Sequence, residues 1–278
     1  MKYKIEKNTV KETLIIPLYA RYQCSKLYPQ LFYDQKAIDL ISQIDYDFSD
    51  LEKKAKSTMQ QFGFLEVAMR QNDLMIEIQD YLKVHPKAAV VNLGCGLDNT
   101  GQVIDNGSCK IYNLDFKEVI DVRNELLPAS ERELNIACDL NDLSWFDQID
   151  DTNGVVFFAA GVFYYFVKED VKTIVCDMAK RFKGGKLVFD GAGKAAVKLM
   201  LKTWIKDAKI KDVNAYFAVN DIKKEIEPWD INIKVSSKGY MLGYHLLDTI
   251  KINPLYRLLS TVGDNMMKMQ IVCIDFIE

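Results

Sequence analysis

The strongest chemical signal in the sequence is a pair of glycines that follows an apolar run. Gly94 and Gly96 flank Cys95, and the apolar residues 88–93 come directly before them. Glycine has no Cβ atom, so the backbone there can turn sharply and let a ligand lie against it. A helix that follows offers unpaired N–H groups to that ligand. An ordinary strand–turn–helix corner also favours glycine, so this motif alone does not decide the function.

An acidic residue stands at the end of the next predicted strand. Asp115 follows the run 110–114 and comes 19 residues after Gly96. A carboxylate at this place can accept hydrogen bonds from both ribose hydroxyls of a nucleoside. It can also cap the helix that begins at Phe116, and the two roles are compatible. The loop and the acid together favour a cofactor that contains a nucleoside.

The residues after the second glycine favour one such cofactor over another. A dinucleotide fingerprint expects a third glycine where Asn99 stands. Asp98 lies in the turn, where its charge would repel a phosphate near the helix N-terminus. S-adenosylmethionine carries adenosine, a sulfonium and an amino-acid tail but no phosphate. We therefore expect S-adenosylmethionine as the cofactor and S-adenosylhomocysteine as its product.

Two further segments follow predicted strands. Asp139 comes after the run 135–138 and could accept the adenine amino hydrogen, although capping of the next helix explains it equally well. The run 154–160 leads into aromatic residues that include Tyr164 and Tyr165. Aromatic rings at the carboxyl edge of a sheet can enclose a methyl-transfer site and attract a sulfonium. Core packing is the alternative for these aromatic residues.

The elements that must position these residues follow from hydrophobic periodicity. Residues 1–85 show helical spacing, and His85-Pro86 is expected to end the last helix there. From Lys87 onward, short apolar runs alternate with stretches of helix length, which indicates parallel strands with crossover helices. The expected strands are 88–93, 110–114, 135–138, 154–160, 186–189, 232–236 and 268–276, and the expected helices after residue 86 are 100–105, 116–127, 143–149, 169–182, 197–205 and 254–260. A turn is expected at 263–265.

Composition excludes several other classes of protein. The chain has 278 residues, 49% of them apolar and 27% charged, and a net charge of −3. A net charge this close to zero argues against a protein whose main task is to bind nucleic acid, because such proteins usually carry a clustered excess of lysine and arginine. Six single cysteines and two histidines indicate free thiols and no metal site. No signal peptide is evident, and the longest apolar stretch, at 14 residues, is too short to span a bilayer. We expect a soluble cytoplasmic protein.

The chain resembles the family of leucine carboxyl methyltransferases and polyketide O-methyltransferases, a class I group that depends on S-adenosylmethionine. The similarity covers roughly residues 10–190. It is carried by four segments in order, which are 12–21 with 33–37, the loop 92–98, the strand 112–116 with 119–120, and 159–165. The resemblance implies an α/β fold with a seven-stranded, doubly wound, Rossmann-like sheet and a helical N-terminal extension. Residues 1–85 would form this extension or lid, and residues 86–278 the cofactor-binding domain.

The resemblance also implies roles for individual residues. Arg70 would bind the cofactor's carboxylate, and Tyr165 would lie at the reacting centre. The residues expected to contact the cofactor are Arg70, Gly94, Cys95, Gly96, Asp98, Asp115, Phe116, Asp139, Leu140 and Ala160. Those expected to face the methyl acceptor are Tyr19, Arg21, Tyr164 and His245.

The N-terminal segment 1–40 is expected to close over the acceptor side of the sheet. It combines apolar, aromatic and cationic groups, and Arg21 could pair with an acidic acceptor. Arg21 could also form a surface ion pair while Tyr19 packs between helices. His245 could serve as a general base for a hydroxyl acceptor, although a packed histidine is the simpler interpretation.

Two positions depart from the family pattern. Ala160 stands where the family often has glutamate, and Thr100 where it often has arginine. The expected function is methyl transfer from S-adenosylmethionine to a carboxyl or hydroxyl oxygen of a small molecule. Two alternatives stay open, which are an oxidoreductase with a nucleotide cofactor and a protein that binds S-adenosylmethionine without catalysis.

Overall fold

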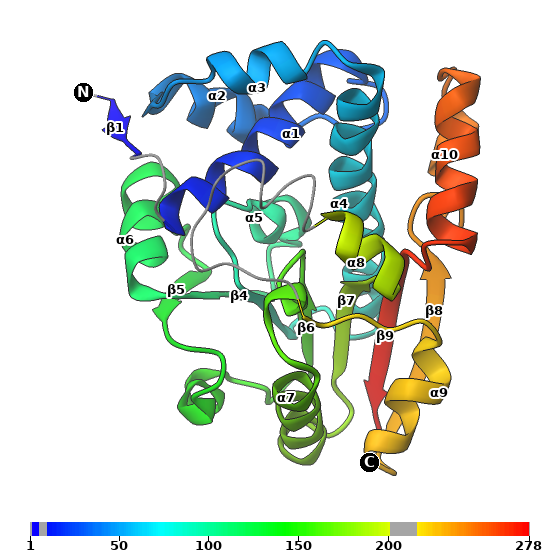
Figure 1. Cartoon of the computed structure of the whole chain (residues 1–278). Coiled ribbons are helices and arrows are strands. Elements are labelled where there is room, and N and C mark those ends of the chain that lie inside the picture. Colours follow the sequence, from blue (N-terminus) through cyan, green and yellow to red (C-terminus); the bar gives the residue numbers. More distant parts are fainter. Residues whose placement is uncertain (1, 6–9, 201–215, 278) are drawn as a thin grey trace.

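A computed structural model of the chain describes residues 2–5, 10–200 and 216–277 (Figure 1). Its centre is a seven-stranded sheet in the order β5-β4-β3-β6-β7-β9-β8. The strands are β3 (Ala89–Leu93), β4 (Lys110–Asp115), β5 (Glu133–Ala137), β6 (Val155–Ala159), β7 (Lys186–Gly191), β8 (Ile233–Gly239) and β9 (Gln270–Phe276). All seven expected strands are present, so the predicted fold class is confirmed.

The sheet is parallel except at one edge. Strands β3 to β7 pair in parallel, whereas β9 runs antiparallel to both β7 and β8. A small two-stranded sheet of β1 (Tyr3–Lys4) and β2 (Ile44–Asp45) lies apart from it. Because the parallel strands point the same way, their carboxyl ends form one edge, and the ligand crevice is expected there.

Helices cover both faces of this sheet. The described α-helices are α1 (Ile15–Leu27), α2 (Gln35–Gln43), α3 (Ser49–Lys54), α4 (Thr58–Val84), α5 (Thr100–Ile104), α6 (Lys117–Leu126), α7 (Lys168–Arg181), α8 (Lys194–Met200), α9 (Ile222–Ile226) and α10 (Pro254–Asn265). The 3-10 turns are η1 (Val10–Leu14), η2 (Leu143–Gln148), η3 (Phe163–Tyr165), η5 (Glu227–Trp229) and η6 (Leu246–Thr249).

Successive side chains along each strand point to opposite faces of the sheet, and this explains why there is a hydrophobic core on each face. Val90 and Phe158 belong to the core that includes apolar residues of α4, whereas their neighbours Val91 and Phe157 belong to the core that includes those of α7. Successive side chains of a strand point to opposite faces, so a strand buried on both faces reads as a continuous apolar run. This is why the strands were predictable from the sequence.

The N-terminal helices lie over the carboxyl edge of the sheet, where Figure 1 shows α1 crossing above the strands. Ile15 and Leu18 share a buried cluster with Leu97 of the glycine loop and Val119 of α6. As expected, the last helix of this region, α4, ends at Val84. Since α4 packs against the sheet, the extension shares a core with the rest of the chain.

Two predicted elements differ in the structure, and a third is only partly described. The expected helix 143–149 is the 3-10 turn η2, and part of the expected helix 197–205 lies outside the described residues. The turn predicted at 263–265 is wrong, because α10 continues to Asn265. The Asp264 carboxylate accepts hydrogen bonds from the backbone N–H groups of Met241 and Leu242, so a tertiary contact holds this residue within the helix.

None of the described helices is both long and apolar enough to cross a membrane. Within the same described part of the chain, no group of three acidic, cysteine or histidine side chains could hold a metal ion.

Candidate active site

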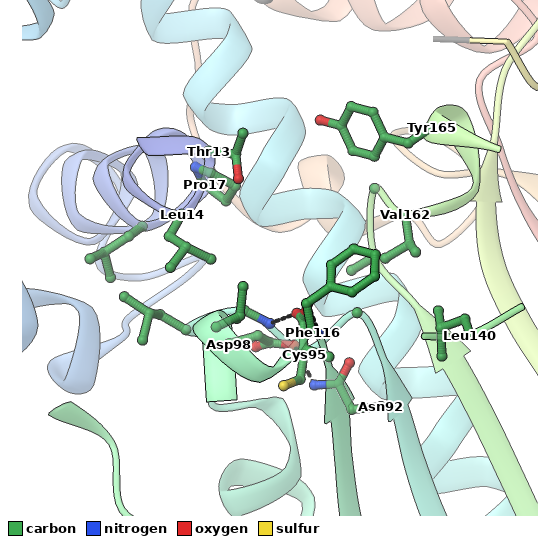
Figure 2. A pocket seen from close by; sticks show the side chains of 18 of the residues that line it. Thr13, Leu14, Pro17, Asn92, Cys95, Asp98, Phe116, Leu140, Val162 and Tyr165 are labelled. Carbon is green, nitrogen blue, oxygen red and sulfur yellow. Dashed lines mark hydrogen bonds between the residues drawn. The ribbon is translucent and has the colours of Figure 1, made fainter. Parts of the chain in front are cut away.

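Two cavities open at the carboxyl ends of the parallel strands, beneath the N-terminal segment. The first cavity has a volume of about 470 Å³. Figure 2 shows Thr13 and Pro17 on one side of it and Tyr165 on the other, with Phe116 projecting between them. It is lined by most of the predicted site residues, namely Arg21, Arg70, Gly94, Cys95, Gly96, Asp98, Asp115, Phe116, Leu140, Ala160 and Tyr165.

The glycine loop forms the floor of the first cavity. Gly94 and Gly96 have φ angles of +66° and +47°, a region that side-chain-bearing residues rarely adopt. A Cβ atom on Gly94 would also lie 2.6 Å from Cγ2 of Val162. The thiol of Cys95 between them is buried, and burial raises its pKa, so it stays protonated at neutral pH. The loop therefore offers backbone and shape to a ligand, but no nucleophile.

Asp115 projects from the end of β4 into the first cavity. Its Oδ2 accepts the backbone N–H of Gly96 at 2.8 Å, and its Oδ1 accepts the N–H of Phe116 at 2.8 Å. A carboxylate can accept about four hydrogen bonds, so each oxygen keeps a free lone pair. Burial raises the pKa of this carboxyl, while the two N–H groups lower it. The arrangement suits two further donors from a ligand.

Asp98 is less available than its sequence position indicated. Its Oδ1 lies 3.3 Å from Nη1 of Arg21 and accepts hydrogen bonds from Gln71 at 2.7 Å and from the N–H of Thr100 at 2.9 Å. Oδ2 accepts one from Asn92 at 3.3 Å. Arg21 is shared between Asp98 and Asp34, so this group of two carboxylates and one guanidinium keeps a formal net charge of −1 that still disfavours a phosphate.

Arg21 holds the N-terminal helix to the glycine loop. The guanidinium, 4% exposed, pairs with Asp34 and Asp98 at 3.3 Å each and donates to the carbonyl oxygen of Leu97 at 2.7 Å. These contacts engage its two terminal nitrogens, while its buried Nε has no hydrogen-bond partner among the described residues. That Arg21 meets an acidic acceptor stays a prediction. A buried network replaces the surface ion pair that we considered as the alternative.

Arg70 lies on α4 at the wall of the first cavity. Its Nη1 donates to Oδ2 of Asp190 at 3.1 Å, and its buried Nε has no hydrogen-bond partner within the described part of the chain. Oδ1 of Asp190 accepts the N–H of Gly161 at 2.6 Å. Asp190 thus supplies a carboxylate next to Ala160, the position where the family often has glutamate. Sequence reasoning missed Asp190, although its place at the end of β7 matches that of Asp115 at the end of β4.

The segment after β5 contributes one of its two predicted residues. Leu140 lines the first cavity together with Cys138 and Asn141. Asp139 is exposed and outside the lining, and its Oδ1 accepts the N–H of Asn141 at 2.9 Å. Asp139 therefore shapes the turn before η2, whereas the side chain that caps η2 is Asp142, which accepts the N–H of Ser144. A contact between Asp139 and adenine stays a prediction.

The second cavity, of about 500 Å³, adjoins the first. The two share the wall formed by Pro17, Arg70, Ala160, Gly161 and Tyr165. Tyr164 lines only the second cavity, where burial and the nearby Asp190 raise the pKa of its hydroxyl. Much of the remaining lining is apolar, with four methionines at positions 59, 200, 267 and 269.

Glu66 is a second residue that sequence reasoning missed. It lies on α4 one turn before Arg70 and lines the second cavity. Burial raises the pKa of Glu66 to about 8, with Arg70 opposing the shift and Asp264 adding to it. A carboxyl four residues before an arginine on one helix is the only sequence signal that could have singled it out.

Two predicted acceptor residues lie elsewhere. Tyr19 is 2% exposed and stacks on Phe48, because its face of α1 packs against the neighbouring helices. His245 is 81% exposed and its ring pairs with Asp248 at 3.2 Å. In the described structure, neither residue lines either of the two cavities at the carboxyl edge of the sheet.

The fold and the loop define a class of protein. A sheet in this order, with a glycine loop after β3 and an acid at the end of β4, is the architecture of methyltransferases that use S-adenosylmethionine. A provisionally assigned methyltransferase of Thermobifida fusca has the same fold. It superposes with a TM-score of 0.61 at 13% identity, covering 98% of this chain and 96% of that one.

The chain belongs to the leucine carboxyl methyltransferase family, whose sequence pattern matches residues 18–179, more than half of its length. It is 26% identical over 182 residues to the tetracenomycin polyketide synthesis O-methyltransferase TcmP of Streptomyces glaucescens, covering 65% of each chain. This match spans less than two thirds of TcmP. The chain is 23% identical to the S-adenosyl-L-methionine-dependent methyltransferase dpfgK of Gibberella zeae, covering 87% of this chain and 85% of that one. The resemblance inferred from the motifs is confirmed.

The residues of the first cavity fit S-adenosylmethionine. The free lone pairs of Asp115 suit two ribose hydroxyls, and the unpartnered Nε of the charged Arg70 suits a carboxylate. A cavity of about 470 Å³ is within the range of small-molecule sites.

Proposed function

We propose that the chain transfers the methyl group of S-adenosylmethionine to an oxygen of a small, largely apolar molecule. The observation that carries this proposal is the shared wall of the two cavities, where Arg70 and Tyr165 border both. A cofactor in the first cavity and an acceptor in the second would meet at this wall. Family membership and the printed names of TcmP and dpfgK support the same reaction class.

Each part of the cofactor has a matching group in the first cavity. Asp115 binds the ribose hydroxyls, and Leu140 borders the adenine. The loop from Gly94 to Gly96 holds the amino-acid tail, whose carboxylate pairs with Arg70. When bound, the cofactor supplies an electrophilic methyl group on a cationic sulfur. Tyr165 lies where its ring can contact that cation, which favours the binding of a sulfonium.

Positioning supplies much of the acceleration in such a transfer. Holding two reactants at near-attack distance is worth about 7–11 kcal/mol in favourable intramolecular cases. The N-terminal segment contributes to this, since Thr13 and Pro17 line both cavities. Residues 1–85 therefore act as a lid that excludes water, and they add Arg70 to the cofactor site that residues 86–278 otherwise form. We place this reaction in the cytoplasm.

Calorimetric titration with S-adenosylhomocysteine and with NAD⁺ tests the proposal. Tighter binding of S-adenosylhomocysteine is expected, because Asn99 replaces the glycine that a dinucleotide loop needs. Tighter binding of NAD⁺ would indicate an oxidoreductase. Binding of S-adenosylhomocysteine without transfer to any acceptor would indicate a sensor or scaffold.

A further inference from the structure

The charged groups of the second cavity restrict which acceptor it can take. Among the described residues that line it, three carry a formal charge, namely Glu66, Arg70 and Asp190. Arg70 and Asp190 are paired with each other at 3.1 Å. Both oxygens of Asp190 are occupied, one by Arg70 and the other by the N–H of Gly161. The described lining therefore has no spare cation for an acceptor carboxylate.

Glu66 is held differently from Asp190. No hydrogen bond or ion pair joins its carboxyl to another described residue, although it faces the cavity. The titratable groups near it are Arg70 on the same helix, Asp264 on α10 and Tyr240 after β8. A negatively charged acceptor would meet this carboxyl without a counter-ion, at a cost that grows as the site becomes drier.

The remaining lining favours a flat apolar molecule. Phe62, Tyr240, Val262, Met267 and Met269 line the second cavity together with Glu66. Methionine sulfur makes favourable contacts at the edges of aromatic rings, and its flexible chain adapts to ring shape. The side chains present therefore suit an aromatic skeleton with a single polar substituent.

We propose that the second cavity takes a neutral aromatic acceptor bearing a hydroxyl group, that Glu66 is the general base for this hydroxyl, and that carboxylate acceptors are excluded. This inference rests on the proposed methyl transfer and narrows it. The acceptor oxygen forms a bond to the methyl carbon while the carbon–sulfur bond breaks and its electron pair returns to sulfur. The hydroxyl proton passes to an oxygen of Glu66, so the sulfonium charge is neutralised and the carboxylate becomes a carboxylic acid.

The raised pKa of Glu66, about 8, suits this role. A base works best when its pKa lies near the operating pH. No histidine replaces it, since neither cavity is lined by His85 or His245.

The test compares two probes of the same shape, 2-naphthol and 2-naphthoate, with the chain loaded with S-adenosylhomocysteine. We expect 2-naphthol to bind more tightly at pH 8. Between pH 6 and pH 9 the Kd of 2-naphthoate should rise about tenfold, because Glu66 gains its charge over that interval. In Glu66→Gln this rise should vanish, whereas the matched variant Glu125→Gln, on the exposed face of α6, should keep it.

Tighter binding of 2-naphthoate across this pH range, an unchanged pH dependence in Glu66→Gln, or no binding of either probe would overturn the inference. Methyl transfer to 2-naphthol should fall about 100-fold in Glu66→Gln, the usual contribution of a general base. The KM for 2-naphthol should stay the same, and the melting temperature of Glu66→Gln should not fall, because the substitution removes a carboxyl whose ionisation burial disfavours. Equal transfer rates in the two chains would count against Glu66 as the base.

Titration with S-adenosylhomocysteine separates this inference from the proposed function. Glu66→Gln should bind S-adenosylhomocysteine as tightly as the parent chain. A parent chain that fails to bind it would contradict the proposed function, while the comparison of the two naphthalene probes, repeated with the chain free of S-adenosylhomocysteine, would still report on the charge of Glu66.

Discussion

The two cavities share the wall at Arg70 and Tyr165, but their carboxylates are held in different ways. In the first cavity, Asp98 accepts hydrogen bonds from several neighbours and Asp115 accepts two from the backbone. On the side of the second cavity, Glu66 has no partner among the described residues. Asp73, two turns further along α4, is fully buried with both carboxyl oxygens unpartnered.

This difference suits the first cavity to binding a cofactor and the second to moving a proton. Carboxylates that already accept several hydrogen bonds hold a loop in place. Their remaining lone pairs then point in fixed directions, which suits the binding of a single cofactor. A carboxyl without partners has a displaced pKa and can exchange a proton, which suits a base. We therefore expect substitutions that remove hydrogen bonds to have their largest effects in the first cavity. In the second cavity, substitutions that change the charge of a carboxyl should matter most.

The largest effect is expected from Arg21→Ala, which removes the counter-ion of the first cavity. Breaking a buried pair leaves Asp34 and Asp98 uncompensated, so the free energy of unfolding should fall by about 3–5 kcal/mol. Urea denaturation measures this. Arg132→Ala, which breaks the exposed pair with Asp105, is the control and should cost much less. If the two variants lost similar amounts of unfolding free energy, the hydrogen-bond network around Asp98 would contribute little to stability.

The role of Arg21 also changes the expectation for a shortened chain. The glycine loop, Asp98 and Asp115 all come after residue 40, so their positions in the sequence alone predict that a chain lacking residues 1–40 still binds the cofactor. The truncation would remove Arg21 and Asp34 together and leave Asp98 without its cation. Cofactor affinity is now expected to fall together with methyl transfer.

The next largest effect is expected from Asp115→Ala on cofactor affinity. Two hydrogen bonds from ribose to a charged acceptor, each worth about 1.5–3 kcal/mol, would be lost. The Kd of S-adenosylhomocysteine should rise about 100-fold or more by calorimetry, while the melting curve reports whether the loop stays folded. Asp139→Ala is the matched control outside the cavity and should leave the Kd unchanged. If Asp115→Ala left the Kd of S-adenosylhomocysteine unchanged, as expected for Asp139→Ala, Asp115 would act only as a helix cap.

A smaller effect is expected from Gly94→Ala, and Gly107→Ala isolates its cause. Both glycines have positive φ angles, +66° and +78°, so both substitutions carry a strain of about 1–2 kcal/mol. Only at Gly94 would the new Cβ atom also meet Val162, which adds about 1–3 kcal/mol. Thermal unfolding should show this difference. No difference would mean that β6 and η3 move to admit the methyl group.

The smallest effect, with the opposite sign, is expected from Asp73→Asn. Burial raises the pKa of Asp73 to about 9, with Asp264 and Glu77 adding to the shift and Lys238 opposing it. Since the unfolded chain releases this proton near pH 4 and the folded chain keeps it, stability falls as the pH rises between those values.

Asp73→Asn removes that dependence and should stabilise the chain by at least about 1 kcal/mol at pH 8, with little gain near pH 4. Melting temperatures at the two pH values measure it. The control Asp80→Asn, exposed on the same helix, should show no such gain. A constant difference at both pH values would mean that packing, and not the proton, is responsible.

The sequence could predict the first cavity because its parts are local. Gly94 and Gly96 follow β3 directly, and Asp115 ends the neighbouring strand, so a parallel sheet must bring them to one edge. The strands themselves were recognisable because burial on both faces requires continuous apolar runs. Asp190 likewise lies at the carboxyl end of a parallel strand, β7. Its position in the sequence, directly after an apolar run, is the signal that could have identified it.

The second cavity could not be predicted in this way. Its lining comes from the N-terminal turn, α4, β7, α8 and α10, which are far apart in the chain. Tyr19 and Arg21 lie two residues apart in α1, yet one packs against helices and the other reaches the glycine loop. Helical spacing predicts that they face different sides, but not which neighbour each side meets.

The sequence by itself determined the sheet, the glycine loop, the acid at the end of β4 and the family, since each depends on short-range pattern and strand alternation. Only the tertiary structure decided that Arg21 pairs with Asp98, that Asp190 pairs with Arg70, and that Glu66 has no partner among the described residues. The physical reason is that the charge state and availability of a side chain depend on which groups surround it, and those groups come from distant parts of the chain.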